Sequence, residues 1–280
     1  MTKHDMTSAD WMALLDFYIE AGVDCALDEV AHNRFQESTV VKKVVVSEAK
    51  QVSSSSQFPP PVLASSSGTR SLPKLAAGAP EKAAEDARMK AQSARSLEEL
   101  HAFLAAFDGC GLKFSARNLV FADGNPQARV MMVGEAPGAD EDLQGKPFVG
   151  RSGMLLDRML AAIGLDRTSA YISNIIPWRP PGNRTPTPQE IAVCKPFIMR
   201  HIELAAPKIL VTLGGPATQT LLGVKEGILK TRGRWYSYEG EKISITALAM
   251  LHPAYLLRQP LQKRFAWRDL LSLQQALKAE

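Results

Sequence analysis

The second half of the chain alternates between short apolar runs and longer stretches with apolar residues at helical spacing. The short runs suit buried strands and lie at 128–134, 170–176 and 208–214. The longer stretches predict helices at 151–164, 187–206, 216–223 and 261–279. A hairpin-like pair of strands is expected at 234–249. Strands that alternate with helices predict an α/β fold whose mostly parallel sheet is covered by helices on both faces.

The first third of the chain is organised differently. Residues 8–22 place apolar side chains on one helical face, so we expect a helix that docks on the main body or on a protein partner. Residues 47–80 are rich in Ser, Pro and Ala, which predicts a disordered linker. A second helical region is expected at 81–106. The sequence therefore divides into an N-terminal helical segment (1–46), the linker and a main domain (81–280).

Composition narrows the class of protein. Of the 280 residues, 45% are apolar and 22% are charged, as is usual for a soluble globular protein. The three cysteines form no CxxC pair, which argues against a zinc ribbon or a disulfide framework. We find no secretion signal and no apolar run of membrane length, and we expect a cytoplasmic protein without a membrane partner.

Charge is distributed unevenly along the chain. The net charge is +4, but residues 171–280 alone carry 15 basic and 7 acidic residues. This surplus suggests an anionic partner, with nucleic acid first, although charge alone is equally consistent with a solvated basic face.

Ligand sites of open parallel sheets form at the carboxyl ends of strands, so the segments after the predicted strands are the places to search. Glu135 follows the first strand within a glycine-rich segment, 134–153, that matches neither a P-loop nor a dinucleotide fingerprint. It is a candidate general base or electrostatic stabiliser, unless loop amides bind its carboxylate. The acidic run at 140–142 is more typical of a solvated face than of a metal site. Phe148 could pack in the core or against a ligand.

Asn174 lies at the end of the second strand. Its amide can donate and accept hydrogen bonds as the edge of a nucleobase does, or it can bond its own loop. The proline-rich loop beyond it carries Arg179 and Arg184, and a stiff basic loop suits phosphate contacts.

The last predicted strand is followed by the segment HPAYLLR. His252 precedes a proline and is therefore expected to be extended. A lone histidine is more often structural than catalytic. Here Tyr255, Leu256 and Leu257 would form an apolar prominence beside Arg258, which is how proteins open a step of a DNA duplex.

These motifs together resemble family 4 of the uracil-DNA glycosylase superfamily, over about residues 107–280. The matching segments are GEAPG and GKPFVGRSG within 134–153, SNIIPWRPPGNR (173–184), ILVTLGGPA (209–217), RGRWY (232–236) and HPAYLLR (252–258). The resemblance implies a three-layer α/β/α sandwich around a four-stranded, mostly parallel sheet. It also implies an enzyme that flips deoxyuridine out of DNA and hydrolyses the N-glycosidic bond.

The resemblance assigns roles to individual residues. Glu135 would position or activate the attacking water and stabilise the cationic sugar, and His252 would donate a hydrogen bond to the departing uracil. Phe148 would stack on uracil and Asn174 would hydrogen-bond its edge. Leu256 or Leu257 would fill the space left by the flipped nucleotide. The implied contacts with uracil further include Gly134 and Ala136, and those with DNA include Arg179, Arg184, Tyr255, Leu256, Leu257 and Arg258.

One departure from the family concerns a cofactor. Family 4 members usually hold a 4Fe–4S cluster on four cysteines, and the corresponding positions here are Phe107, Cys110, Trp178 and Cys194. A cluster of this type needs four ligands, so we expect no cluster and no other metal. We expect the two aromatic side chains to fill the volume of the cluster and the two cysteines to be free thiols.

Two classes of function compete at this point. The first is a monomeric, monofunctional glycosylase that acts on uracil in single- or double-stranded DNA, since no motif places a lysine for Schiff-base chemistry. The second is a non-catalytic module that binds uracil or abasic DNA, or an accessory domain of a repair or polymerase complex. Because a pure binder needs neither Glu135 nor His252, their joint presence favours the enzyme.

Overall fold

The structure, a computed structural model, describes residues 79–279. The predicted helix at 8–22 and its protein partner, the segment 1–46 and most of the linker at 47–80 lie outside the described residues. The predicted helical region at 81–106 is two helices, α3 (Ala79–Ser93) and α4 (Leu97–Ala106). The first begins two residues before the predicted start of the helical region at 81. The second begins after Ser96, whose side chain accepts a hydrogen bond from the amide of Glu99.

The sheet has six strands in the order β1-β3-β2-β4-β6-β5. Their bounds are β1 (Ala122–Gly124), β2 (Val130–Gly134), β3 (Ala170–Asn174), β4 (Ile209–Leu213), β5 (Trp235–Glu239) and β6 (Ser244–Met250). The four inner strands are parallel, and β1 and β5 pair antiparallel at the two edges. The predicted four-stranded sheet is therefore the parallel centre of the observed sheet. The predicted strand count was wrong because it omitted the two edge strands. The hairpin-like pair at 234–249 is confirmed as β5 and β6.

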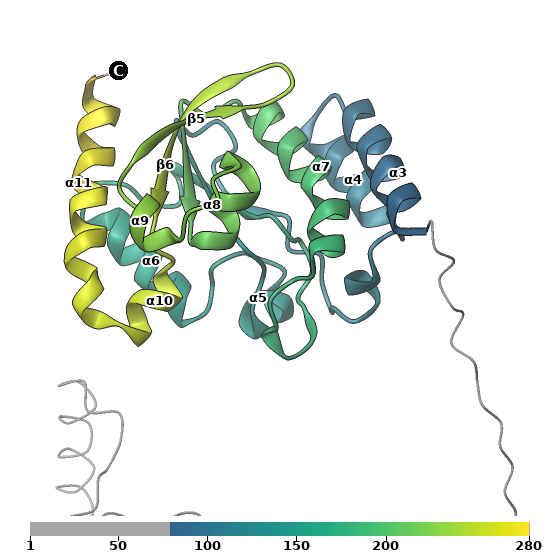
Figure 1. The fold of residues 1–280 in the computed structure, drawn as a ribbon, viewed down its shortest axis with the longest axis horizontal. Coiled ribbons are helices and arrows are strands. Elements are labelled where there is room, and N and C mark those ends of the chain that lie inside the picture. The colour runs from purple at the N-terminus through teal and green to yellow at the C-terminus, as the bar shows by residue number, and fades with distance from the viewer. Residues whose placement is uncertain (1–78, 280) are drawn as a thin grey trace, which may run out of the picture. The chain divides into compact units, whose positions relative to one another are not determined.

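Helices cover both faces of this sheet. Beyond α3 and α4 they are α5 (Ala139–Gln144), α6 (Arg151–Ala161), α7 (Pro188–Ala205), α8 (Gly215–Leu222), α9 (Ile228–Thr231), α10 (Pro253–Arg258) and α11 (Lys263–Ala279), with short 3-10 turns at Gly111–Phe114, Pro181–Asn183 and Pro260–Gln262. Figure 1 shows α3, α4 and α7 to one side of the sheet and α6, α10 and α11 to the other. None of the helices between Ala79 and Ala279 is long and apolar enough to cross a lipid bilayer.

The alternation of side chains along the strands divides the core in two. In β2, Met131 and Val133 pack with residues of α3, α4 and α7, whereas Val130 and Met132 pack with residues of α6, α10 and α11. All four are at most 1% exposed, and burying a side chain of this size contributes about 1.5–3 kcal/mol. Because β2, β3 and β4 are buried on both faces, each reads as a continuous apolar run, and this made them predictable.

Candidate functional site

The predicted site residues gather at the carboxyl ends of the parallel strands. Gly134 and Asn174 are the last residues of β2 and β3 and face each other in the register of the two strands. Glu135 directly follows β2, and His252 lies two residues beyond β6. Strand register therefore sets the spacing of these groups, as expected for a site at the carboxyl ends of parallel strands.

Gly134 is the point where two predicted uracil-binding side chains meet. A Cβ atom added to Gly134 would lie 2.5 Å from Oδ1 of Asn174 and 2.7 Å from Cζ of Phe148, so any larger residue there would have to displace both side chains. Asn174 is 4% exposed, and its Oδ1 atom accepts no hydrogen bond from residues 79–279. A buried acceptor without a partner costs free energy, and such an orphan next to an aromatic ring suits a planar ligand with an N–H group.

Phe148 has an unusual backbone conformation. Its φ angle is +54°, in the left-handed region that costs a residue with a side chain roughly 1–2 kcal/mol. Its ring is 4% exposed and lies nearly parallel to the ring of His252, with the centroids 5.4 Å apart and 29° between the planes. The strained backbone thus places the ring between Gly134, Asn174 and His252, where the resemblance puts a uracil-stacking aromatic.

The protonation of His252 follows from its place at the start of α10. Its backbone is extended, as the following proline predicts, and its Nδ1 atom accepts a hydrogen bond of 3.1 Å from the amide of Ala254. Nδ1 is therefore unprotonated and the proton of the neutral ring is on Nε2. Burial, with a smaller effect of the positive charge of Arg258, lowers the pKa of His252 to about 4, against an opposing effect of Glu141. His252 is thus a neutral donor at pH 7.

Glu135 lies on the wall of a cleft of about 390 Å³, together with Ala136, His252, Tyr255 and Arg258. Burial raises the pKa of the half-buried Glu135 carboxyl above its ordinary value of 4.5. No hydrogen bond holds its carboxylate within residues 79–279, so the alternative in which loop amides bind it does not apply. Phe148 and Asn174 are not part of the lining of this cleft, and they adjoin it through Gly134, the neighbour of Glu135.

The predicted solvated face at 140–142 applies to Asp140, which is exposed, but not to the two residues that follow it. Glu141 and Asp142 are 7% and 3% exposed. Glu141 accepts hydrogen bonds from the amides of Gly138, Val149 and Gly150, and Asp142 accepts those of Arg117 and Asn118. These two carboxylates fasten loops around the site, a role that sequence reasoning missed because it depends on backbone amides up to 25 residues away.

The two leucines of the predicted DNA wedge differ in position. Leu256 is 1% exposed and packs in the core with α6 and α11, so its side chain does not reach the surface in this structure. Leu257 is 36% exposed and is the leucine that can reach DNA. The reason is local, because consecutive residues of α10 point about 100° apart and one of them must face the sheet.

The predicted phosphate-binding arginines also differ. Arg258 is exposed on the cleft wall and has no ion-pair partner within residues 79–279. Arg184 lines the same cleft but forms a bidentate pair with Glu190 at 2.6 and 2.8 Å, which also raises the pKa of Arg184. Arg179 donates to Oδ1 of Asn183 at 2.7 Å. The charge of Arg184 is therefore compensated, whereas that of Arg258 is available.

The four positions that correspond to cluster ligands lie together in the core. Phe107, Cys110, Trp178 and Cys194 are each at most 3% exposed and belong to one apolar cluster. The Cys194 thiol donates a hydrogen bond to Sγ of Cys110 at 3.9 Å, and no disulfide joins the two residues. The neighbouring Cys110 sulfur, together with burial, raises the pKa of the Cys194 thiol. Two thiols and two aromatic rings do not fit a 4Fe–4S cluster, because only two of the four side chains can be ligands.

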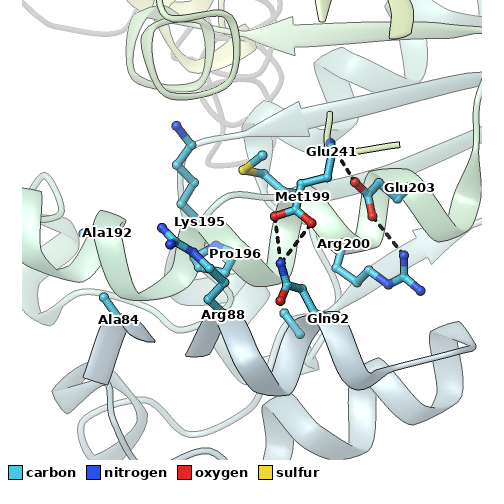
Figure 2. Close-up of a pocket in the computed structure, with 11 residues that line it drawn as sticks. Ala84, Arg88, Gln92, Ala192, Lys195, Pro196, Met199, Arg200, Glu203 and Glu241 are labelled. Atoms are coloured by element: carbon cyan, nitrogen blue, oxygen red, sulfur yellow. Dashed lines mark hydrogen bonds and ion pairs between the residues drawn. The ribbon is translucent and has the colours of Figure 1, made fainter. Parts of the chain in front are cut away.

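A second cavity, of about 590 Å³, lies between α3 and α7 (Figure 2). On its rim Gln92 donates to both carboxylate oxygens of Glu241 at 2.9 Å, and Arg200 pairs with Glu203 at 2.9 Å. The amide of Glu241 also donates to Oε1 of Glu203 at 3.0 Å, so Glu241 connects α3 and α7 with the turn between β5 and β6. None of the predicted site residues lines this cavity, whose lining also includes Arg88 and Lys195.

Comparison with known proteins agrees with this geometry. A family model described as "Uracil DNA glycosylase superfamily" matches residues 121–271. The chain is 39% identical to a type-4 uracil-DNA glycosylase of Archaeoglobus fulgidus over 171 residues, or 59% of this chain and 85% of that protein. It is 43% identical to that of Thermotoga maritima over 150 residues, 53% of this chain and 77% of that protein. A DNA polymerase of Bacillus phage SP01 is 33% identical over 148 residues, 52% of this chain and 16% of the polymerase. On the strength of the matched domain, the relatives and the residues gathered at the strand ends, this chain belongs to the uracil-DNA glycosylase superfamily.

Proposed function

We propose that this chain is a monofunctional uracil-DNA glycosylase that flips deoxyuridine out of DNA and hydrolyses its N-glycosidic bond. The observation that carries the proposal is the unpartnered, buried Oδ1 of Asn174 beside the rings of Phe148 and His252, with Glu135 at the same edge. Flipping is needed because the reacting carbon cannot be reached inside the base stack.

Base recognition follows from the donor and acceptor pattern of the Asn174 amide. Uracil presents an N–H donor at N3 and an acceptor at O4. Asn174 can accept from the first with Oδ1 and donate to the second with Nδ2. Cytosine presents an acceptor at N3 and an amino donor at C4, so the same amide faces two mismatched groups. A mismatch of buried hydrogen-bonding groups is a strong basis for rejection.

Two further groups drive hydrolysis. Water attacks C1′, the C1′–N1 bond breaks, and its electron pair leaves with uracil as an anion. The Nε2–H of neutral His252 donates to the developing negative charge on the uracil oxygen. The carboxylate of Glu135 orients the water, accepts its proton and stabilises the cationic sugar. A neutral histidine suits this role, because its Nε2–H stabilises the uracil anion by a hydrogen bond without transferring a proton to it.

The function is tested with labelled oligonucleotides that carry one deoxyuridine, deoxycytidine or thymidine at the same place. We expect cleavage at uracil alone, and only after treatment with hot alkali, which breaks the strand at abasic sites. Breakage without alkali would contradict monofunctional chemistry. Tight binding of uracil-containing DNA without any cleavage would support the non-catalytic module instead. In that case the match to part of a phage polymerase would favour an accessory domain of a polymerase complex. The same experiment on single- and double-stranded substrates decides the strand preference.

The salt dependence of DNA binding is expected to separate the two arginines of the cleft. Each phosphate contact contributes about 0.9 to the slope of log K against log salt concentration on duplex DNA. Arg258→Ala should lower that slope by about 0.9, since its charge is uncompensated. Arg184→Ala should change it much less, because Glu190 already neutralises Arg184. Equal changes in both variants, measured by fluorescence anisotropy between low and moderate salt, would contradict this assignment.

We also infer that the chain works without a 4Fe–4S cluster, which the packing of Phe107 and Trp178 with the two cysteines supports. Protein purified without oxygen is expected to contain no stoichiometric iron and no absorbance band near about 400 nm. A variant with Phe107→Cys and Trp178→Cys supplies four thiols at these positions and serves as a positive control for loading. Stoichiometric iron in the unmodified protein would overturn the inference.

A further inference from the structure

We propose that Arg167 is a positioning residue for uracil excision, which acts by holding the backbone of Phe148 in its left-handed conformation. This inference rests on the proposed function, in which the ring of Phe148 stacks on uracil. Arg167 lies in the turn between α6 and β3, outside every motif that the family resemblance matched.

The backbone around Phe148 needs such a restraint. With a φ angle of +54°, the residue is in a conformation that side chains disfavour, so another conformation of the loop is favoured unless contacts oppose it. The carbonyl of Phe148 turns toward α6, where a Cβ atom on Gly153 would collide with it. The loop has no regular secondary structure of its own, and the restraint must come from side chains.

Arg167 binds two successive carbonyl groups of this loop. Its Nη1 atom donates to the carbonyl of Pro147 at 3.2 Å, and its Nη2 atom donates to the carbonyl of Phe148. The planar guanidinium can satisfy both acceptors at once because its donors are fixed relative to one another. These two bonds determine the orientation of the peptide groups on both sides of the Phe148 Cα atom.

Two carboxylates hold the guanidinium itself. Nη1 is 2.6 Å from Oδ2 of Asp123 in β1, and Nε is 2.9 Å from Oδ1 of Asp157 in α6. Asp123 also pairs with Lys146, one residue before Pro147, at 3.5 Å. The short edge strand β1 thereby supplies the anchor for the loop, and the arginine has little freedom to move away.

Glu141 restrains the same loop through the backbone N–H groups of that loop. Its Oε1 atom accepts the amides of Val149 and Gly150 at 3.0 and 2.9 Å, and its Oε2 atom accepts the amide of Gly138 at 3.0 Å. Arg167 therefore fixes the carbonyls up to Phe148, and Glu141 fixes the amides after it. The ring is left facing Asn174 and His252, so the stacking surface is preformed before a base arrives, which reduces the entropy lost on binding.

The test uses a double-mutant cycle. Arg167→Lys keeps the positive charge beside Asp123 and Asp157 but cannot bond both carbonyls with a fixed fork, and Arg158→Lys, at an exposed position of α6, is the control. In single turnover with saturating enzyme, we expect Arg167→Lys to slow uracil excision about tenfold and to weaken inhibition by free uracil similarly. Affinity for abasic DNA should not change. In a Phe148→Ala background, Arg167→Lys should have no further effect, because its target ring is absent.

Hydrogen exchange provides a second readout that needs no activity. The amides of Val149 and Gly150 should exchange faster in Arg167→Lys than in the unmodified protein, while exchange in the segment that carries His252 stays the same. Equal slowing of excision in both backgrounds, or unchanged exchange at Val149 and Gly150, would overturn the proposal. If the unmodified protein does not excise uracil, the proposed function fails, and the exchange experiment still decides whether Arg167 restrains the loop.

Discussion

Replacing Glu135 by Gln is expected to slow uracil excision about 1,000-fold at pH 7, within the range for loss of a general base that also stabilises developing charge. Gln keeps the shape of the side chain but neither accepts the proton of water nor carries the negative charge. The rate of the chemical step, measured in single turnover on a deoxyuridine oligonucleotide, should fall, whereas the affinity for abasic DNA should not.

The raised pKa of the Glu135 carboxyl predicts two control measurements, the stability of the variant and its pH–rate profile. Above that pKa the folded protein must hold an ionised carboxylate in a half-buried place, so the group destabilises the fold at neutral pH, and this effect disappears as the pH falls through it. Glu135→Gln should therefore not lower the melting temperature at pH 7. The acid limb of the pH–rate profile, above pH 4.5 in the unmodified protein, should vanish in the variant. A rate within tenfold of the unmodified protein would move the catalytic role elsewhere.

Replacing His252 by Asn is expected to slow excision by about 100- to 1,000-fold, the usual cost of losing one donor to a developing anion. Asn is a good residue at the start of a helix and can still accept the amide of Ala254, so α10 should keep its cap. His252→Ala removes both the donor and the cap, and should lose about 1 kcal/mol of stability in addition. The comparison of the two variants separates catalysis from folding.

The pH dependence tests the protonation state of the same residue. Because the pKa of His252 is lowered to about 4, the rate should show no inflection near pH 6.5, where an exposed histidine titrates. If the unmodified enzyme loses activity above pH 6.5 and His252→Asn does not, the imidazolium is the donor. That result would contradict the assignment of a neutral ring.

Much of this architecture could be predicted from the sequence, for identifiable physical reasons. The inner strands could be recognised because burial on both faces requires continuous apolar runs, and His252 because a following proline forces an extended backbone. Strand β1 could not, because Ala122–Gly124 is short and carries no apolar pattern. This strand matters because it places Asp123 beside Arg167, a contact that only the folded chain reveals.

The site likewise contains features that the sequence predicts and features that it does not. Glu135 and Asn174 could be placed because the ends of neighbouring parallel strands must meet. The choice between Leu256 and Leu257 depends on the direction in which a six-residue helix faces, which one turn of sequence does not reveal. The ion pair of Arg184 with Glu190 could have been predicted from the sequence. Thr187 and Glu190 have the spacing of a capping box, and such a box fixes the glutamate near the loop.

The pairing of Gly134 with Asn174 in the strand register has a consequence for denaturation. Asn174 and Gly134, the residues proposed to meet the base, are held by the ladder of hydrogen bonds between two central strands, which are buried on both faces. Such ladders open only when the whole domain unfolds. In increasing urea, the ability to tell uracil from cytosine should therefore persist until the cooperative transition, even when the loop that carries Phe148 has already loosened and turnover has declined.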